Sequence, residues 1–134
     1  MKTTLPFLLL LITLIQFSFC TNNTSNAGES TAKPLKYSAN KLMQKFDKNA
    51  IKYDTLFARK AIELEGIITE IEVGTNGETI FTLDTKSKDQ AKLKCIMLSD
   101  DMQYEPGKKV CLIGFYKEFN FHVFLDKCIT CNSK

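Results

Sequence analysis

The sequence of 134 residues is poor in the groups that enzymes use for catalysis. It contains a single histidine, His122. It has no nucleophile elbow, no phosphate-cradling glycine loop and no pair of metal-binding histidines. A lone histidine in a β-hairpin pattern is more often a partly buried side chain than a catalytic base. We therefore predict that the chain is not an enzyme and needs no cofactor.

A large excess of charge is also missing. The formal net charge is +3 and the isoelectric point is about 8.6. A dedicated nucleic-acid-binding domain usually has a more strongly basic balance, so charge alone decides nothing about this ligand class. The apolar run from Leu5 to Phe19 is shorter than the roughly 20 residues of a typical membrane-spanning helix.

The start of the chain has the pattern of a secretory signal. Lys2 precedes the apolar run, and a polar segment follows Cys20. This pattern predicts a signal peptide over residues 1–20, with a retained membrane anchor as the alternative. Cys20 stands where a bacterial lipoprotein carries its acylated cysteine, although Phe19 is bulkier than the residue usual before it. Lipidation of Cys20 and ordinary cleavage after it both remain open.

A tether and a helix are predicted next. Residues 21–37 have little to bury, which predicts a flexible tether. Ser38 is a good N-cap for a helical pattern that continues to Tyr53. One face of this helix is apolar, and the other carries Lys41, Lys45, Lys48 and Lys52. The lysines form either a solvated face or a basic stripe for phosphates or anionic headgroups.

Five β-patterned segments with turn signals between them occupy the rest of the chain. They are predicted at residues 61–73, 78–85, 91–98, 108–116 and 121–130. The first changes its apolar phase near Gly66, as expected of a bulge that bends a strand around a barrel. A small closed barrel is favoured because an open sheet would leave two exposed edges. We predict one mostly β domain over residues 38–131, with one N-terminal helix, a five-stranded barrel and a tail over residues 132–134.

The spacing of apolar, glycine and cysteine residues carries a resemblance. The relevant patterns are Lys60-x-Ile62-x-Leu64-x-Gly66-x-Ile68, Leu93-x-Cys95, Pro106-Gly107-x-x-Val110-x-Leu112-x-Gly114 and Val123-x-Leu125-x-x-Cys128. Over about Ser38 to Ile129 the chain resembles the tRNA-anticodon-domain-like OB-fold family of exported bacterial proteins, many of which carry lipoprotein signals. The resemblance implies an OB-fold barrel. It includes no catalytic residue, so it implies a fold rather than an activity.

The resemblance also points to a candidate ligand surface. An OB barrel binds ligands across its second and third strands and at the loops between strands one and two and strands four and five. Residues 74–77 and 117–120 would form these loops. The candidate residues are Thr75, Asn76, Lys117, Phe119 and Phe121. Their rings could stack on bases and Lys117 could meet a phosphate, whereas a structural role in the sheet is the alternative. Phe119 is expected to be the most exposed ring because it lies at the predicted turn.

Four cysteines fall within the predicted domain, and an oxidising compartment would allow them to form disulfides. The OB strand order implied by the resemblance makes Cys95 and Cys128 the preferred pair, and it leaves Cys111 and Cys131 paired or free. Two alternatives remain. Cys128 and Cys131 have redox spacing, and Cys111, Cys128, Cys131 and His122 could supply a zinc site.

The resulting expectation is a non-catalytic OB-fold binding or adaptor module of the bacterial cell envelope. It would lie in the periplasm, or at a membrane surface if Cys20 carries a lipid. Its partner would be a protein, a peptide or a glycan. A nucleic-acid-binding OB domain is the alternative, which export disfavours. A thiol-disulfide enzyme that uses Cys128 and Cys131 is a third hypothesis.

Overall fold

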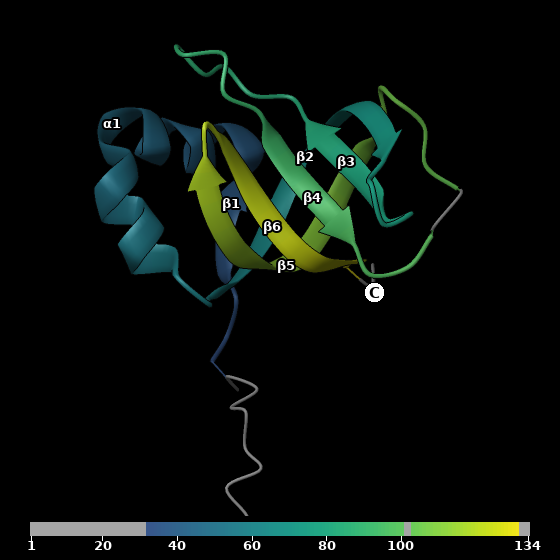
Figure 1. The fold of residues 1–134 in the computed structure, drawn as a ribbon, viewed down its shortest axis with the longest axis horizontal. Helices are drawn as coiled ribbons and strands as arrows, with labels where there is room; N and C mark the ends of the chain where they lie inside the picture. Colours follow the sequence, from purple (N-terminus) through teal and green to yellow (C-terminus); the bar gives the residue numbers. More distant parts are fainter. Residues whose placement is uncertain (1–31, 101–102, 132–134) are drawn as a thin grey trace, which may run out of the picture.

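The computed structural model describes residues 32–100 and 103–131 and shows a curved sheet with a helix packed against it (Figure 1). Its elements are β1 (Leu35–Ser38), α1 (Ala39–Phe57), β2 (Ala61–Val73), β3 (Thr79–Leu83), β4 (Leu93–Met97), β5 (Lys109–Asn120) and β6 (His122–Thr130). The predicted signal peptide, Cys20 and the tail lie outside the described residues. Among the described helices, none is long and apolar enough to span a bilayer.

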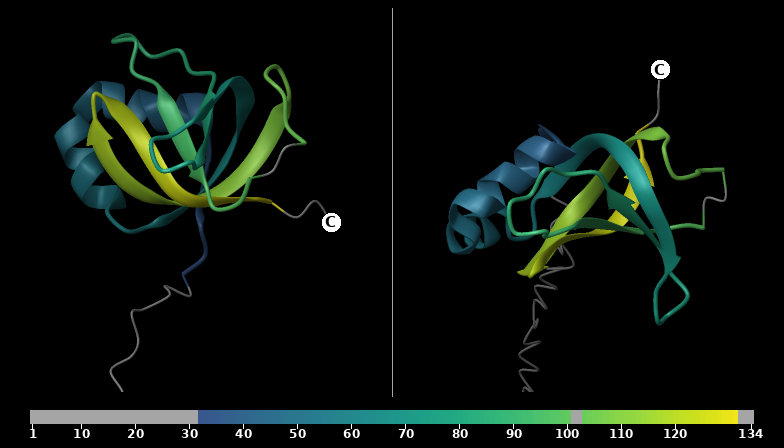
Figure 2. Two further views of the ribbon diagram at one scale, coloured as in Figure 1. Left: turned by 45° about the vertical axis from the view of Figure 1, so that its right-hand side comes forward. Right: turned by 90° about the horizontal axis from the view of Figure 1, so that it is seen from above.

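The last five strands close into a barrel, which confirms the predicted fold class (Figure 2). The first half of β2 pairs antiparallel with β5 and its second half pairs antiparallel with β3. β3 pairs antiparallel with β4, β4 pairs in parallel with β6, and β6 pairs antiparallel with β5. A register shift between Ile68 and Glu70 marks the bulge in β2, slightly beyond the predicted position near Gly66. The strand order is the one expected of an OB barrel.

The start of the domain differs from the prediction in one respect. A short strand, β1, precedes the helix and pairs in parallel with β2, from Leu35 opposite Ile62 to Ser38 opposite Glu65. Residues 35–37, which were predicted to be the end of a tether, therefore belong to β1. The helix begins as predicted, because the Ser38 hydroxyl accepts a hydrogen bond from the Lys41 backbone N–H at 3.3 Å.

Helix α1 extends beyond the predicted end and bends in its middle. Asn49 has φ −161° and ψ 84°, which interrupts the helical backbone. Its side-chain Oδ1 then accepts from the Lys52 N–H at 3.0 Å and caps the second helical segment. The continuation places Phe57, a buried residue, against the barrel.

An aromatic cluster fixes α1 to the barrel. The ring centroid of Phe46 lies 5.5 Å from that of Phe119, 5.6 Å from that of Tyr116 and 5.9 Å from that of Phe57. The Tyr116 hydroxyl also hydrogen-bonds to Asp54 Oδ1 on the helix. Burial, and then this hydrogen bond, raise the pKa of Tyr116 above its ordinary value near 10. Helix and barrel consequently share one core.

Candidate ligand-binding face

The outward side of β3, β4 and β6 is the part of the barrel on which OB folds bind ligands. On β4, Leu93 and Cys95 point into the core, whereas Lys94 and Ile96 are only half-buried. The observed register places Ile80 and Thr82 of β3 and Phe124 of β6 beside these two residues, and Thr82 is itself buried. We call the outward residues the barrel face: Ile80, Thr82, Lys92, Lys94, Ile96 and Phe124.

The lysines of the barrel face are paired with carboxylates of β2. Lys94 Nζ hydrogen-bonds to Glu72 Oε1, and Lys92 Nζ lies 3.4 Å from Glu70 Oε2. The Lys94 and Glu72 side chains are 17% and 35% exposed, so this pair is largely shielded from solvent. The barrel face is therefore close to neutral, with ion pairs beside apolar side chains.

A row of rings extends the barrel face toward the turn between β5 and β6. The Phe121 ring is 61% exposed, and its centroid lies 4.9 Å from that of His122, which is 6.3 Å from that of Phe124. His122 Nδ1 accepts a hydrogen bond from the Lys92 N–H at 3.0 Å. Burial, and then the charges of Lys94 and Lys92, lower the pKa of His122. The imidazole is thus a neutral acceptor that ties the turn to the start of β4.

One buried hydroxyl opens onto the barrel face. Thr82 is only 3% exposed, and within the described residues its Oγ1 has no hydrogen-bond partner. It lines a pocket of about 160 Å³ together with Thr69, Thr85 and Lys92. An unsatisfied buried hydroxyl is unfavourable by about 1–3 kcal/mol, so a ligand or water with a polar atom here would be stabilised.

Of the five predicted ligand residues, Lys117 and Phe119 lie in β5, and the other three form two groups outside the strands. Thr75 and Asn76 lie in the β2–β3 loop, which is next to the β4–β5 loop. Thr79, just after the first loop, donates a hydrogen bond from its Oγ1 to Oδ1 of Asp100 in the second (2.9 Å). Phe121 forms the β5–β6 turn at the opposite end of the barrel (Figure 1). A bound ligand would have to run along the barrel face to touch both groups.

Two details of the predicted turn are wrong. Lys117 lies within β5 and is exposed, and the chain reverses at Phe121, which has φ +59°. Phe119 is partly buried against Phe46, so Phe121 and not Phe119 is the exposed ring. Ile96 and Phe124 were not among the predicted ligand residues. The period-two alternation of their strands would have identified both as outward residues.

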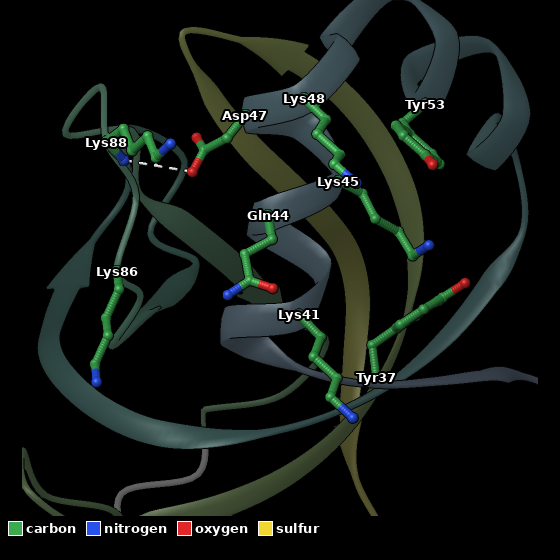
Figure 3. A pocket seen from close by; sticks show the side chains of 9 residues that line it. All are labelled: Tyr37, Lys41, Gln44, Lys45, Asp47, Lys48, Tyr53, Lys86 and Lys88. Carbon is green, nitrogen blue, oxygen red and sulfur yellow. Dashed lines mark hydrogen bonds between the residues drawn. The ribbon is translucent and has the colours of Figure 1, made fainter.

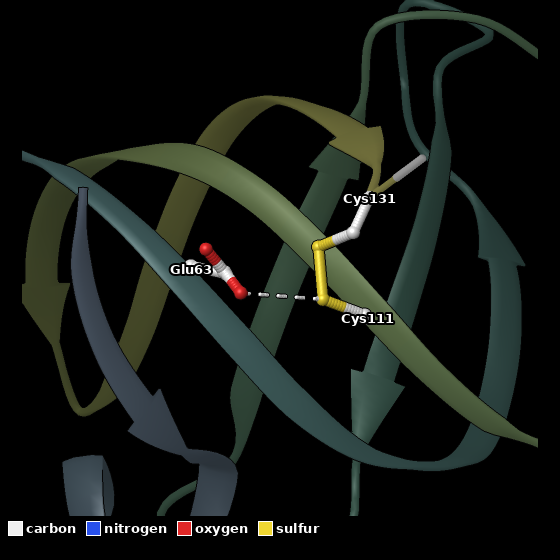
Figure 4. Close-up of side chains that lie close together, drawn as sticks. All are labelled: Glu63, Cys111 and Cys131. Atoms are coloured by element: carbon white, nitrogen blue, oxygen red, sulfur yellow. Dashed lines mark hydrogen bonds between the residues drawn. A yellow bond between two sulfur atoms is a disulfide. The ribbon is translucent and has the colours of Figure 1, made fainter. Parts of the chain in front are cut away.

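The preferred disulfide is wrong, and the second pairing is the one that forms. Cys111 and Cys131 are joined by a disulfide (Figure 4), whereas Cys95 and Cys128 are buried free thiols. β5 and β6 place Leu112 opposite Thr130, so Cys111 and Cys131 continue this register. Contact with Cys128, and then burial, raise the pKa of Cys95, which disfavours its thiolate.

No predicted metal or redox site is assembled within the described residues. Glu63 lies beside the disulfide, with its Oε1 3.9 Å from Cys111 Sγ (Figure 4). The same oxygen lies 3.2 Å from Lys36 Nζ. Because Cys111 and Cys131 are bonded to each other, this cluster offers only a carboxylate. The disulfide also leaves Cys128 without Cys131 as a redox partner.

Comparison with known proteins agrees with this architecture. A family model described as tRNA_anti-like matches residues 1–129. A crystal structure from Klebsiella pneumoniae, called a "putative nucleic acid-binding lipoprotein", is similar at 18% identity with a TM-score of 0.60. The match covers 74% of this chain and 92% of that one. No curated protein matches the sequence.

Proposed function

Since the chain belongs to the tRNA_anti-like family and folds as an OB barrel, we propose that it is a non-catalytic binding or adaptor module. Its ligand lies along the barrel face, between the β2–β3 loop and the turn at Phe121. The ligand is a protein, a peptide or a glycan of the cell envelope.

The pairing of Lys92 and Lys94 with Glu70 and Glu72 is the observation that carries this proposal. A nucleic acid gains most of its affinity from cations that neutralise its phosphates. On the barrel face these cations are already neutralised. Ile96, Phe124 and Phe121 instead offer the apolar and aromatic contacts that are common in protein interfaces.

A nucleic-acid-binding OB domain is the second candidate. The name of the Klebsiella protein favours it. The ring row of Phe121, His122 and Phe124 also favours it, because exposed rings can stack on bases. The two candidates differ in how their affinity should depend on salt.

Export to the envelope is part of the proposal. The signal pattern of residues 1–20 and the lipoprotein name of the similar structure support it. Cleavage after Cys20 would place the domain in the periplasm, and lipidation of Cys20 would hold it at a membrane surface. The tether before Leu35 would then separate the domain from its anchor.

Fluorescence anisotropy with a labelled oligothymidylate tests the choice between the two candidates. Every described core residue lies between Ala39 and Cys128, so the chain from Thr21 onward retains the whole core and is the form to use. We expect no saturable binding by the barrel face at about 50 mM salt. Binding that weakens steeply by about 200 mM salt and is lost in Ile96→Ser with Phe121→Ala would favour the nucleic-acid function.

A further inference from the structure

A second surface, separate from the barrel face, gathers positive charge on the exposed side of α1. It is a shallow pocket of about 710 Å³ (Figure 3). We call it the lysine groove, after the five lysines that line it: Lys41, Lys45, Lys48, Lys86 and Lys88. The first three come from α1, and the other two come from the β3–β4 loop.

The β3–β4 loop is held in place on the helix by three hydrogen bonds. Ser87 Oγ donates to Asp47 Oδ1 at 2.7 Å, and the Lys88 N–H donates to Asp47 Oδ2 at 3.3 Å. The Lys86 N–H donates to Asn40 Oδ1 at 3.2 Å. These bonds use the backbone of Lys86 and Lys88, whose side chains also line the groove, although the Lys86 side chain does not point toward the lysines of α1 (Figure 3).

The charge in the groove is not balanced. Among the residues that the structure describes, Asp47 is the only carboxylate that lines it, and both of its oxygens accept hydrogen bonds from the loop. Over the described part of the chain, the lysines in ion pairs are Lys36, Lys92 and Lys94, none of which lines the groove. A protein with a formal net charge of only +3 thus concentrates unpaired cations on one face.

The rings at the edge of the groove are not free to stack on bases. Tyr37 and Tyr53 pack on Phe57, with centroids 5.8 and 5.6 Å from its ring. Lys45 Nζ lies 5.4 Å from the centroid of Tyr37 and 5.1 Å from that of Tyr53. The groove therefore offers charge without a stacking platform, which fits phosphate headgroups better than a single-stranded nucleic acid.

The helix that carries three of these lysines also has an exposed apolar side chain. Ile51 follows the bend in α1, lies between Lys48 and Lys52 in the sequence and is 84% exposed. Lysines with an exposed aliphatic residue on one helix, and tyrosines nearby, are typical of helices that lie at a membrane interface. This combination favours a lipid surface over a small soluble phosphate.

The groove is also close to the predicted anchor along the chain. Tyr37 belongs to β1, the first element of the domain. Residues 21–34 span at most about 50 Å when fully extended. A chain held to a membrane through residues before Thr21 would thus keep the groove within reach of the bilayer.

We propose that the lysine groove docks the domain onto anionic phospholipid headgroups. The barrel face then remains exposed to its partner. The proposal concerns a different surface from the barrel face, so a failure of either proposal leaves the other standing.

Vesicle flotation with the chain from Thr21 onward tests this docking without any lipid anchor. The probes are vesicles of phosphatidylcholine alone and vesicles with about one-third phosphatidylglycerol, at low and physiological salt. We expect binding only to the anionic vesicles, and we expect it to be stronger at low than at physiological salt. Lys41→Gln/Lys45→Gln/Lys48→Gln should lower the partition coefficient on the order of 100-fold.

The matched control is Lys108→Gln/Lys109→Gln/Lys127→Gln, which removes the same charge from exposed lysines outside the groove. It should bind within about threefold of the unmodified chain. If the triple glutamine variant of the groove unfolds, Lys41→Glu/Lys48→Glu replaces it, because this variant keeps the contacts of Lys45 with Tyr37 and Tyr53. Equal losses in control and groove variants, equal binding to neutral vesicles, or no vesicle binding would overturn the proposal. Groove-dependent binding of an oligonucleotide without vesicle binding would also overturn it.

Discussion

Lys94 and Glu72 form a largely shielded ion pair in the middle of the face on which OB barrels bind ligands. Lys94 lies on β4 opposite Thr82 of β3, and Glu72 lies on β2 opposite Ile80 of β3. The carboxylate therefore reaches across a whole strand to the ammonium group. A phosphate that approached this face would have to displace Glu72 before it could meet the ammonium group of Lys94.

Removal of the acidic partners should turn the barrel face into a phosphate-binding surface. Glu70→Gln/Glu72→Gln frees Lys92 and Lys94 while the lysines themselves are kept. In oligothymidylate titrations we expect the affinity to rise, and the slope of log K against log salt to become steeper by about 1.4, for two freed cations. Glu105→Gln/Glu118→Gln is the control with the same change in net charge. An equal effect of both variants would show that only net charge matters.

Two phenylalanines should differ sharply in their effect on stability. Phe46 is buried among the rings that join α1 to β5, so Phe46→Ala should lower the free energy of unfolding by about 3–5 kcal/mol. Phe121 is exposed, and Phe121→Ala should change it by less than about 0.5 kcal/mol. Urea unfolding followed by circular dichroism measures both. A large loss in Phe121→Ala would mean that its ring is structural rather than available to a ligand.

The disulfide pattern can be counted directly in the chain from Thr21 onward. Thiol titration in denaturant should detect Cys95 and Cys128 before reduction, and Cys111 and Cys131 only after it. Cys111→Ser/Cys131→Ser should lower the free energy of unfolding by about 3 kcal/mol, because the disulfide closes a loop with a sequence separation of 20. Protection of Cys95 and Cys128 from alkylation in the denatured, unreduced chain would contradict the observed pairing.

Alkaline pH should weaken the contact between α1 and the barrel. The pKa of Tyr116 is raised in the folded state, so the protonated phenol stabilises the fold below its ordinary pKa near 10. As the pH rises above about 10, the unfolded chain loses this proton more readily and the free energy of unfolding falls. Tyr116→Phe should show a smaller fall between about pH 9 and 11. Identical pH profiles would mean that Tyr116 does not contribute.

Much of the fold follows from local sequence patterns. Ser38 before a helical apolar pattern predicted the start of α1. Alternating apolar residues predicted β2 with the same first and last residues as observed. Asn76-Gly77 predicted the first hairpin turn, where Gly77 has φ +82°. These signals act within a few residues, so a single sequence contains them.

The errors arose where distant segments set the outcome. The β5–β6 hairpin reverses at Phe121 rather than within residues 117–120, and this reversal sets Leu112 opposite Thr130 and brings Cys111 to Cys131. Strand order alone placed Cys95 and Cys128 on neighbouring strands but could not give this register. The β3–β4 loop, which forms one side of the lysine groove, is held by a hydrogen bond between Ser87 and Asp47. These residues are 40 positions apart, so no local pattern reveals their contact.

Site-specific photocrosslinking in intact cells can show whether the barrel face binds an envelope partner. A photoreactive phenylalanine analogue would replace Phe124 on the barrel face, and Lys109, an exposed residue of β5, in the control. The account predicts a discrete, protease- or glycosidase-sensitive product from position 124 that is weaker in Ile96→Ser and absent from position 109. A nuclease-sensitive product, or the same product from both positions, would contradict it.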